Sequence, residues 1–259
     1  MELGIAGRTA LLCGSSQGLG YACAEMLVRE GVNVIINGRV PDKLEAAAER
    51  LRALGGGTVR TIAADQTTVE GRKAIIEQAG DIDILVNNNA GPPPGVLADW
   101  DEEAILSAVN ANMIPAVQFI RAFVPGMRAR KFGRIVNITS AMVKSPFYVM
   151  GLSTSARSAL TAMSKAISKD VVIDNVTINN LLPERIDTPR QEFMARRIMA
   201  EQGVDWDEAR RQITDTIAAK RFGRPEEFAS ACAFFCSANA GFISGQNLQV
   251  DGGSYEGVV

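Results

Sequence analysis

The sequence contains no histidine and only four cysteines among its 259 residues, so side chains that bind transition metals are scarce. A structural zinc site usually needs four Cys or His ligands close together. Cys232 and Cys236 share one face of an expected helix, but the chain has no histidine to complete a site around them. We therefore expect no metal, and we interpret Cys13, Cys23, Cys232 and Cys236 as reduced core residues of a cytoplasmic protein.

The chain also lacks a strong charge of either sign and any long apolar run. Its formal net charge is −2, with 27 basic and 29 acidic residues. Nothing in this balance points to nucleic acid or an anionic membrane as a partner. No apolar run reaches the roughly 18 residues that span a bilayer. The opening stretch MELGIAGRTALLCG does not have the pattern of a signal peptide, so we expect a cytoplasmic location.

What the chain does have is a regular alternation of short apolar runs and amphipathic stretches, with 47% hydrophobic residues. The apolar runs suit strands that are buried on both faces. Their alternation with helical patterns predicts an α/β fold, a doubly wound parallel sheet with helices on both faces. Strands are expected at residues 9–13, 32–37, 58–64, 84–88, 134–139, 177–182 and 247–250. Because no linker or repeat interrupts this pattern, we expect a single domain over residues 1–259.

Residues 189–220 form a long, charged and mostly helical stretch that interrupts the alternation. One interpretation is a pair of surface helices. The other is a helical lid over a ligand cleft. We favour the lid, because ligand clefts in such sheets open at the carboxyl ends of the strands.

A glycine-rich turn, CGSSQGLG at residues 13–20, follows the first expected strand and precedes an expected helix. Glycine permits a tight turn and the close approach of a pyrophosphate, and the N-terminus of the next helix attracts phosphate charge. The pattern therefore predicts dinucleotide binding. The candidate cofactor-binding residues of the turn are Gly14, Ser15, Ser16, Gln17, Gly18, Leu19 and Gly20.

The end of the second expected strand indicates which dinucleotide binds. Proteins that select NAD(H) usually place an acidic residue there for the ribose 2′-hydroxyl. This chain has the neutral Asn37 and Gly38, followed by Arg39. A guanidinium at this point can pair with a 2′-phosphate through charge-assisted hydrogen bonds. We therefore favour NADP(H) as the cofactor, with NAD(H) as the alternative. The other interpretation of Arg39 is an exposed side chain at a strand end that binds no ligand.

Six motifs occur in an order typical of one family: CGSSQGLG, NNAG (88–91), NANM (110–113), NITS (137–140), LLPERIDT (181–188) and SGQNLQVDGG (244–253). Through them the chain resembles the short-chain dehydrogenase/reductases over nearly its whole length, and within that family the 3-oxoacyl-thioester reductase-like branch. The resemblance implies a single Rossmann-like domain with seven parallel strands, assembled as a homotetramer or homodimer. It also implies cofactor contacts from Asp65, Gln66, Asn89, Ala90, Gly91, Pro183, Ile186 and Thr188.

The same resemblance implies four catalytic positions, which hold Asn, Ser, Tyr and Lys in the family. Asn112 and Ser140 fill the first two positions of this chain. Ser153 stands where the Tyr belongs, and Arg157 stands where the Lys belongs. Their i,i+4 spacing places both side chains on one helix face. The chain thus resembles an atypical subgroup with Ser-x-x-x-Arg and a proline-rich loop after NNAG.

This departure bears directly on proton transfer. Carbonyl reduction needs a hydride and a proton, and in the family the proton comes from the Tyr, whose ordinary pKa is about 10. A Ser hydroxyl is a far weaker acid, and an Arg keeps its proton at any working pH. We expect Arg157 to hold the cofactor ribose instead. Tyr148, in the loop after Ser140, is either an alternative proton donor or a packing aromatic. Glu184 stands where the family has a Gly, and three roles are open for its carboxylate: accepting a proton, pairing with Arg157, or facing solvent.

Two functions stay open from the sequence. The first is an NADP(H)-dependent oxidoreductase that interconverts a carbonyl and a secondary alcohol, with a 3-oxoacyl thioester or a related ketone as the candidate substrate. Ser140 and Asn112 favour this function. The second is a nucleotide-binding sensor or partner subunit with little or no reductase activity, which Ser153 and Arg157 favour.

Overall fold

The computed structural model describes residues 2–258, and its centre is one sheet of seven strands. All neighbouring strands pair in parallel, in the order β3-β2-β1-β4-β5-β6-β7. The strands are β1 Thr9–Leu12, β2 Asn33–Gly38, β3 Val59–Ala63, β4 Ile84–Asn87, β5 Gly133–Ile138, β6 Val176–Pro183 and β7 Asn247–Val250. The predicted fold class is confirmed, and every expected strand overlaps an observed one.

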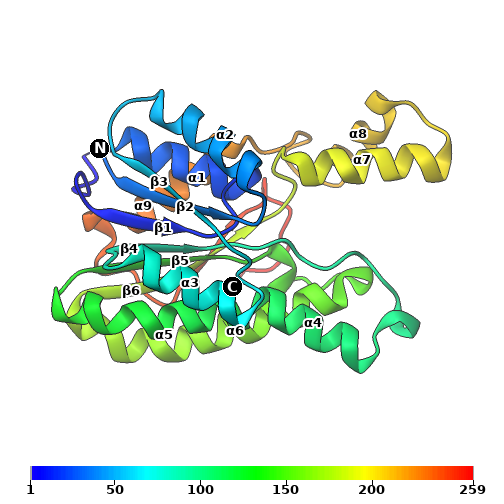
Figure 1. The fold of residues 1–259 in the computed structure, drawn as a ribbon. Helices are drawn as coiled ribbons and strands as arrows, with labels where there is room; N and C mark the ends of the chain where they lie inside the picture. Colours follow the sequence, from blue (N-terminus) through cyan, green and yellow to red (C-terminus); the bar gives the residue numbers. More distant parts are fainter. Residues whose placement is uncertain (1, 259) are drawn as a thin grey trace.

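Helices cover both faces of the sheet (Figure 1). One face carries α1 Gly18–Arg29, α2 Pro41–Arg52 and α9 Pro225–Cys236; the other carries α3 Val69–Ala79, α4 Glu102–Asn112, α5 Ile114–Ala129 and α6 Gly151–Val171. Each face has its own apolar core because the strands between them are buried on both sides. The four cysteines are buried and free, as expected. No helix among residues 2–258 has the length and apolar character needed to cross a membrane.

The stretch 189–220 forms two helices, α7 Pro189–Gln202 and α8 Trp206–Asp215. They share a small apolar core of Ala195, Ala209 and Ile213. Figure 1 shows that they stand apart from the helices flanking the sheet. Because α7 follows directly from β6, it begins at the carboxyl end of the sheet. The predicted helices are present; their action as a lid stays a prediction.

A ladder of asparagine side chains links the four neighbouring strands β4, β5, β6 and β7. The Asn87 amide donates to Asn137 Oδ1 (2.8 Å), the Asn137 amide donates to Asn180 Oδ1 (2.9 Å), and the Asn180 amide donates to Asn247 Oδ1 (2.8 Å). These four residues are also register partners on β4, β5, β6 and β7. Asn137 additionally donates to Ser164 Oγ on α6 (3.0 Å). Buried amides need such partners, so the ladder specifies the register of half the sheet.

We expect Asn137→Ala to lower the free energy of unfolding by about 2–4 kcal/mol, because it leaves buried polar groups on three neighbours without a partner. Urea unfolding followed by circular dichroism measures this change. The control is Asn239→Ala, which removes one exposed hydrogen bond to the Glu2 carbonyl. A loss in Asn137→Ala no larger than in the control would show that the ladder does not stabilise the fold.

Candidate active site

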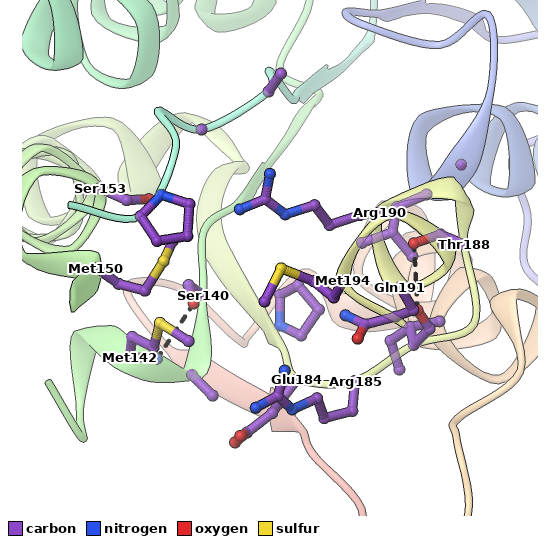
Figure 2. Close-up of a pocket in the computed structure, with 18 of the residues that line it drawn as sticks. Ser140, Met142, Met150, Ser153, Glu184, Arg185, Thr188, Arg190, Gln191 and Met194 are labelled. Atoms are coloured by element: carbon purple, nitrogen blue, oxygen red, sulfur yellow. Dashed lines mark hydrogen bonds between the residues drawn. The ribbon is translucent and has the colours of Figure 1, made fainter. Parts of the chain in front are cut away.

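A cleft of about 880 Å³ lies at the carboxyl ends of the strands. Five chain segments line it: the glycine-rich turn after β1, the NNAG loop after β4, the end of β5 with the loop to α6, the start of α6, and the segment from the end of β6 into α7. Figure 2 shows Ser140, Met142, Met150 and Ser153 on one side, with Thr188, Gln191 and Met194 on the other. The structure thus brings most of the predicted site residues together.

The glycine-rich turn has the form that a pyrophosphate requires. Gly14 has φ +53°, and a Cβ at Gly20 would lie 2.5 Å from the Gly14 carbonyl oxygen, so both positions need glycine. Gln17 precedes α1 without a side-chain capping bond, and the first turn of α1 holds no acidic residue. The first N–H groups of α1 are therefore free to bind phosphate oxygens. A dinucleotide fits this turn.

Only part of the predicted turn faces the cleft. Gly14, Gln17, Gly18 and Leu19 line it, whereas Ser15, Ser16 and Gly20 do not. Ser15 is fully buried, and its hydroxyl donates to the Leu12 carbonyl (2.7 Å). It therefore shapes the turn from behind.

The positions expected near the adenosine end lie past β2 and β3, outside the cleft lining. The buried Asn37 amide donates to the Ile62 and Ala64 carbonyls at 2.9 and 3.0 Å, so it ties β2 to β3. Arg39 is exposed, and its Nη1 lies 3.8 Å from Asp65 Oδ2. Burial acts to raise the pKa of Asp65, but hydrogen bonds from Thr67 and the charge of Arg39 outweigh it, and the pKa falls.

Two further predicted contacts sit on the loop that follows β4. The Gln66 amide donates to the Asn88 carbonyl (2.9 Å) and the Asn89 amide donates to the Ala111 carbonyl (2.7 Å), so both side chains brace the NNAG segment. The loop then passes close to α6, where a Cβ at Gly91 would lie 3.1 Å from Ser153 Oγ. Asn89, Ala90 and Gly91 line the cleft at this point.

Arg157 is buried, and protein acceptors take most of its hydrogen-bonding capacity. Its Nε donates to Ser153 Oγ (3.2 Å), its Nη1 donates to the carbonyls of Ile138 and Thr139, and its Nη2 donates to the Asn89 carbonyl (3.3 Å). A guanidinium has five N–H groups. Four are therefore engaged, and one N–H of Nη2 is left for a ligand at the cleft wall.

No carboxylate among the described residues pairs with Arg157, so its cation is held by backbone carbonyls and by the Ser153 hydroxyl oxygen. Burial lowers the pKa of Arg157 to about 10, and the nearby positive charge of Arg190 adds to this effect. The side chain remains a cation at neutral pH, but its charge is poorly compensated. A ligand that brings electron-rich oxygens to this wall is favoured by the charge.

The other catalytic candidates are not all in the cleft. Ser140 follows β5 and lines the cleft, with its Oγ accepting from the Met142 N–H (3.2 Å). Asn112 is buried at the end of α4 and lines a separate cavity of about 20 Å³ behind the cleft. Tyr148 does not line the cleft: it is 59% exposed, and its hydroxyl accepts from the Leu97 N–H (3.0 Å). The structure therefore does not bring Tyr148 together with Arg157.

Glu184 lines the cleft and is half-buried. Burial raises the pKa of its carboxyl, partly offset by the neighbouring Arg185. No ion pair joins Glu184 to Arg157 among the described residues, and Figure 2 shows the side chain beside Arg185. Of the three expectations for Glu184, proton exchange is the one that this raised pKa favours.

The sequence reasoning did not identify the cleft face of α7. Its residues are Arg190, Met194, Arg197, Ile198 and Glu201, together with Gln191 one position along. Their spacing of three or four residues marks one face of a helix. That periodicity was visible in the sequence, but only the fold shows that this face, and not another, meets the cleft.

These features define a doubly wound α/β protein that binds a dinucleotide in a cleft beside a serine hydroxyl and a buried guanidinium. A family model described as enoyl-(acyl carrier protein) reductase matches residues 14–255. The chain belongs to the short-chain dehydrogenase/reductase family. The acyl carrier protein in that description agrees with the acyl-thioester reductase-like branch expected from the motifs.

Three similar proteins span nearly the same length. The NADPH-dependent reductase BacG of Bacillus subtilis is 31% identical, over 97% of this chain and 99% of its own. Dehydrogenase/reductase SDR family member 4 of Bos taurus is 30% identical, over 95% of this chain and 87% of its own. The crystal structure of L-sorbose reductase from Gluconobacter frateurii with NADPH and L-sorbose is 33% identical, with a TM-score of 0.95 and full coverage of both chains.

We expect Arg39→Ala to weaken NADPH binding by about 1–3 kcal/mol and to leave NADH binding unchanged, because only NADPH carries the 2′-phosphate. Calorimetric titration with each cofactor measures both affinities. The control is Arg50→Ala, which removes the same charge from α2, where Arg50 stacks 4.6 Å from the Tyr21 ring. Equal affinities for NADPH and NADH in the unaltered protein would contradict the assignment.

Proposed function

We propose that this protein is an NADP(H)-dependent oxidoreductase that interconverts a carbonyl and a secondary alcohol. One observation carries the proposal: the phosphate-binding turn, the Ser140 hydroxyl and the Arg157 guanidinium all open into the same cleft. The names of the relatives support it, since BacG is an NADPH-dependent reductase and L-sorbose reductase was crystallised with NADPH. Within this class, a 3-oxoacyl thioester or a related ketone is the candidate substrate.

The residues of the chain take three roles in this reaction. When bound, the dinucleotide supplies or accepts the hydride. The turn at Gly14 and Gly18, with Thr188 opposite, holds its phosphates. The remaining N–H of Arg157 holds a hydroxyl of the nicotinamide ribose, and the Ser140 hydroxyl donates a hydrogen bond to the substrate carbonyl oxygen. That hydrogen bond polarises the carbonyl and fixes its position relative to the hydride.

The proton comes from water in this proposal, with Ser153 as a relay. Ser153 Oγ already accepts a hydrogen bond from Arg157 Nε, so its own proton is directed away from the guanidinium. A hydroxyl in this position can pass a proton from water to an alkoxide, but it cannot act as a poised acid near neutral pH. The protonated form of Glu184 is the second candidate donor, because burial raises its pKa.

We expect Ser153→Ala to lower turnover less than about tenfold, and Tyr148→Phe to leave it unchanged, because Tyr148 lies outside the cleft lining. Restoring the family pair in one protein, Ser153→Tyr with Arg157→Lys, should raise turnover by up to the 10²–10⁴-fold of a general acid. The measurement is NADPH oxidation with a panel of ketones and acyl thioesters. Glu184→Gln belongs in the same assay, and a drop in activity there would identify Glu184 as the donor.

Two outcomes would contradict the proposal. A large loss in Ser153→Ala, with Glu184→Gln unchanged and no gain in the restored pair, would show that Ser153 itself delivers the proton. Tight NADPH binding without turnover of any panel member, before and after restoration of the pair, would favour the nucleotide-binding sensor or partner subunit. That alternative is motivated by the lack of a Tyr at the position of Ser153.

We also propose a homotetramer or homodimer in the cytoplasm. The chain leaves apolar side chains uncovered on α4 and α6, where Ile105 is 47% exposed, Leu106 is 58% exposed and Met163 is 36% exposed. Near the C-terminus, Val258 is fully exposed, while Val259 lies outside the described residues. Burying such surface against a second copy removes apolar area from water.

We expect sedimentation equilibrium at micromolar concentration to give a mass of two or four chains. Leu106→Glu should shift the population toward smaller species, because it places a charge in the proposed contact. Glu103→Gln, on the same helix, is the matched control. A stable monomer in the unaltered protein would refute the assembly.

A further inference from the structure

The loop after β6 and the start of α7 carry polar side-chain atoms that lack partners among the described residues. Arg185 Nε and Gln191 Oε1 are both buried and make no hydrogen bond within the described residues. Arg190 makes no ion pair there either; its guanidinium only lies 5.7 Å from the Phe193 ring. All three side chains line the cleft. Because buried polar atoms are almost always satisfied in folded proteins, these atoms point to a missing ligand.

Arg190 is a solvent-exposed residue of the cleft lining, and no carboxylate among the described residues pairs with it. In Figure 2 its side chain extends from α7 across the cleft toward the side that holds Ser153. Partial burial lowers the pKa of Arg190, and the nearby cation of Arg197 lowers it further. Arg190 in turn lowers the pKa of Arg157 on the opposite wall. Two guanidinium groups that repel each other across a cleft favour the binding of an anion between them.

The carboxylates of the cleft do not fill this role. Asp99 accepts a hydrogen bond from the Val96 N–H (2.8 Å), and Glu201 pairs with Arg197 one turn away on α7. Glu184 lies beside Arg185, and no ion pair joins it to Arg190 among the described residues. Arg190 is therefore, like Arg157 on the opposite wall, a cleft cation to which the described residues supply no anionic partner.

We propose that the substrate carries a free oxyanion, a carboxylate, that binds Arg190 with help from the unpartnered Nε–H of Arg185, while its carbonyl binds Ser140. This proposal rests on the proposed function and narrows its substrate class to oxo acids and the corresponding hydroxy acids. Met142, Met150 and Met194 line the space between the two ends, so an aliphatic chain suits the middle of the substrate.

The cofactor is the other source of an oxyanion in this cleft. Its diphosphate has the uncapped start of α1 and the glycine-rich turn, and its 2′-phosphate has Arg39. Ser140, to which we assign the substrate carbonyl, lies on the same side of the cleft as Ser153. Arg190 extends toward that side from the opposite wall. We therefore assign Arg190 to the substrate, and the experiment separates the two sources.

The test compares a chain-length series of 2-oxo and 3-oxo carboxylates with their methyl esters in NADPH oxidation by the full-length protein. We expect kcat/KM to be at least about tenfold higher for each acid than for its ester. Arg190→Ala should lower kcat/KM for the acids by about 10- to 100-fold and for the esters by less than about threefold. Arg190→Lys should recover part of the loss. The control Arg196→Ala removes the same charge from α7, where Arg196 packs on Trp206 outside the cleft.

Calorimetric titration measures two further quantities. One is the affinity of each variant for NADPH, and the other is the affinity of the NADP⁺-loaded protein for the carboxylates. Arg190→Ala should leave the NADPH dissociation constant unchanged and abolish carboxylate binding. Equal use of acids and esters, or an Arg190→Ala loss that falls equally on both, would overturn the proposal while leaving the oxidoreductase intact. A loss confined to NADPH affinity would assign Arg190 to the diphosphate. If the protein turns over no substrate of the series, the proposed function fails. In that case the inference is decided by the titration alone: it stands if carboxylates bind and Arg190→Ala abolishes this binding, and it falls otherwise.

Discussion

The asparagine ladder is the interaction on which the site depends. Each rung needs its two strands in one register, because a shift by one residue would turn the amide to the other face of the sheet. The ladder ends one residue before Asn88 on β4 and three before Ser140 on β5. It therefore places the NNAG loop and the Ser140 hydroxyl at the same edge, where parallel strands present their carboxyl ends to a ligand.

Backbone carbonyls at that edge of the sheet hold the Arg157 guanidinium in place. The carbonyls of Ile138 and Thr139 point toward α6 at the end of β5, and the Asn89 carbonyl arrives from the neighbouring loop. A lysine has three donors on one nitrogen, whereas the fork of an arginine can bind acceptors on several sides at once. Arg157 thus ties α6 to the end of β5 and to the loop that follows β4. The same buried cation faces Arg190 across the cleft.

The sequence was sufficient for the fold, and it located the glycine-rich turn that lines the cleft. Apolar runs such as TALLC and RIVNIT predict strands buried on both faces, and the structure has a strand at each. The turn at Gly14 and Gly20 is equally readable, since its backbone geometry excludes other residues. Tyr148 shows what the sequence could not predict, namely the contacts of a side chain in a loop. Its place in the loop suggested a proton donor, but its ring packs 5.6 Å from Trp100 and its hydroxyl binds the Leu97 N–H.

What the sequence determined by itself were the local patterns: strand and helix periodicity, the glycine turn, and the Ser153 and Arg157 pair four residues apart. Periodicity and spacing act between residues close in the chain, so they can be read without coordinates. Only the tertiary structure decided that Asn112 lies behind the cleft and that Arg190 extends across it without an acidic partner among residues 2–258. Those facts depend on which distant segments meet and which polar atoms are left unpaired when they do, and no local pattern encodes that meeting.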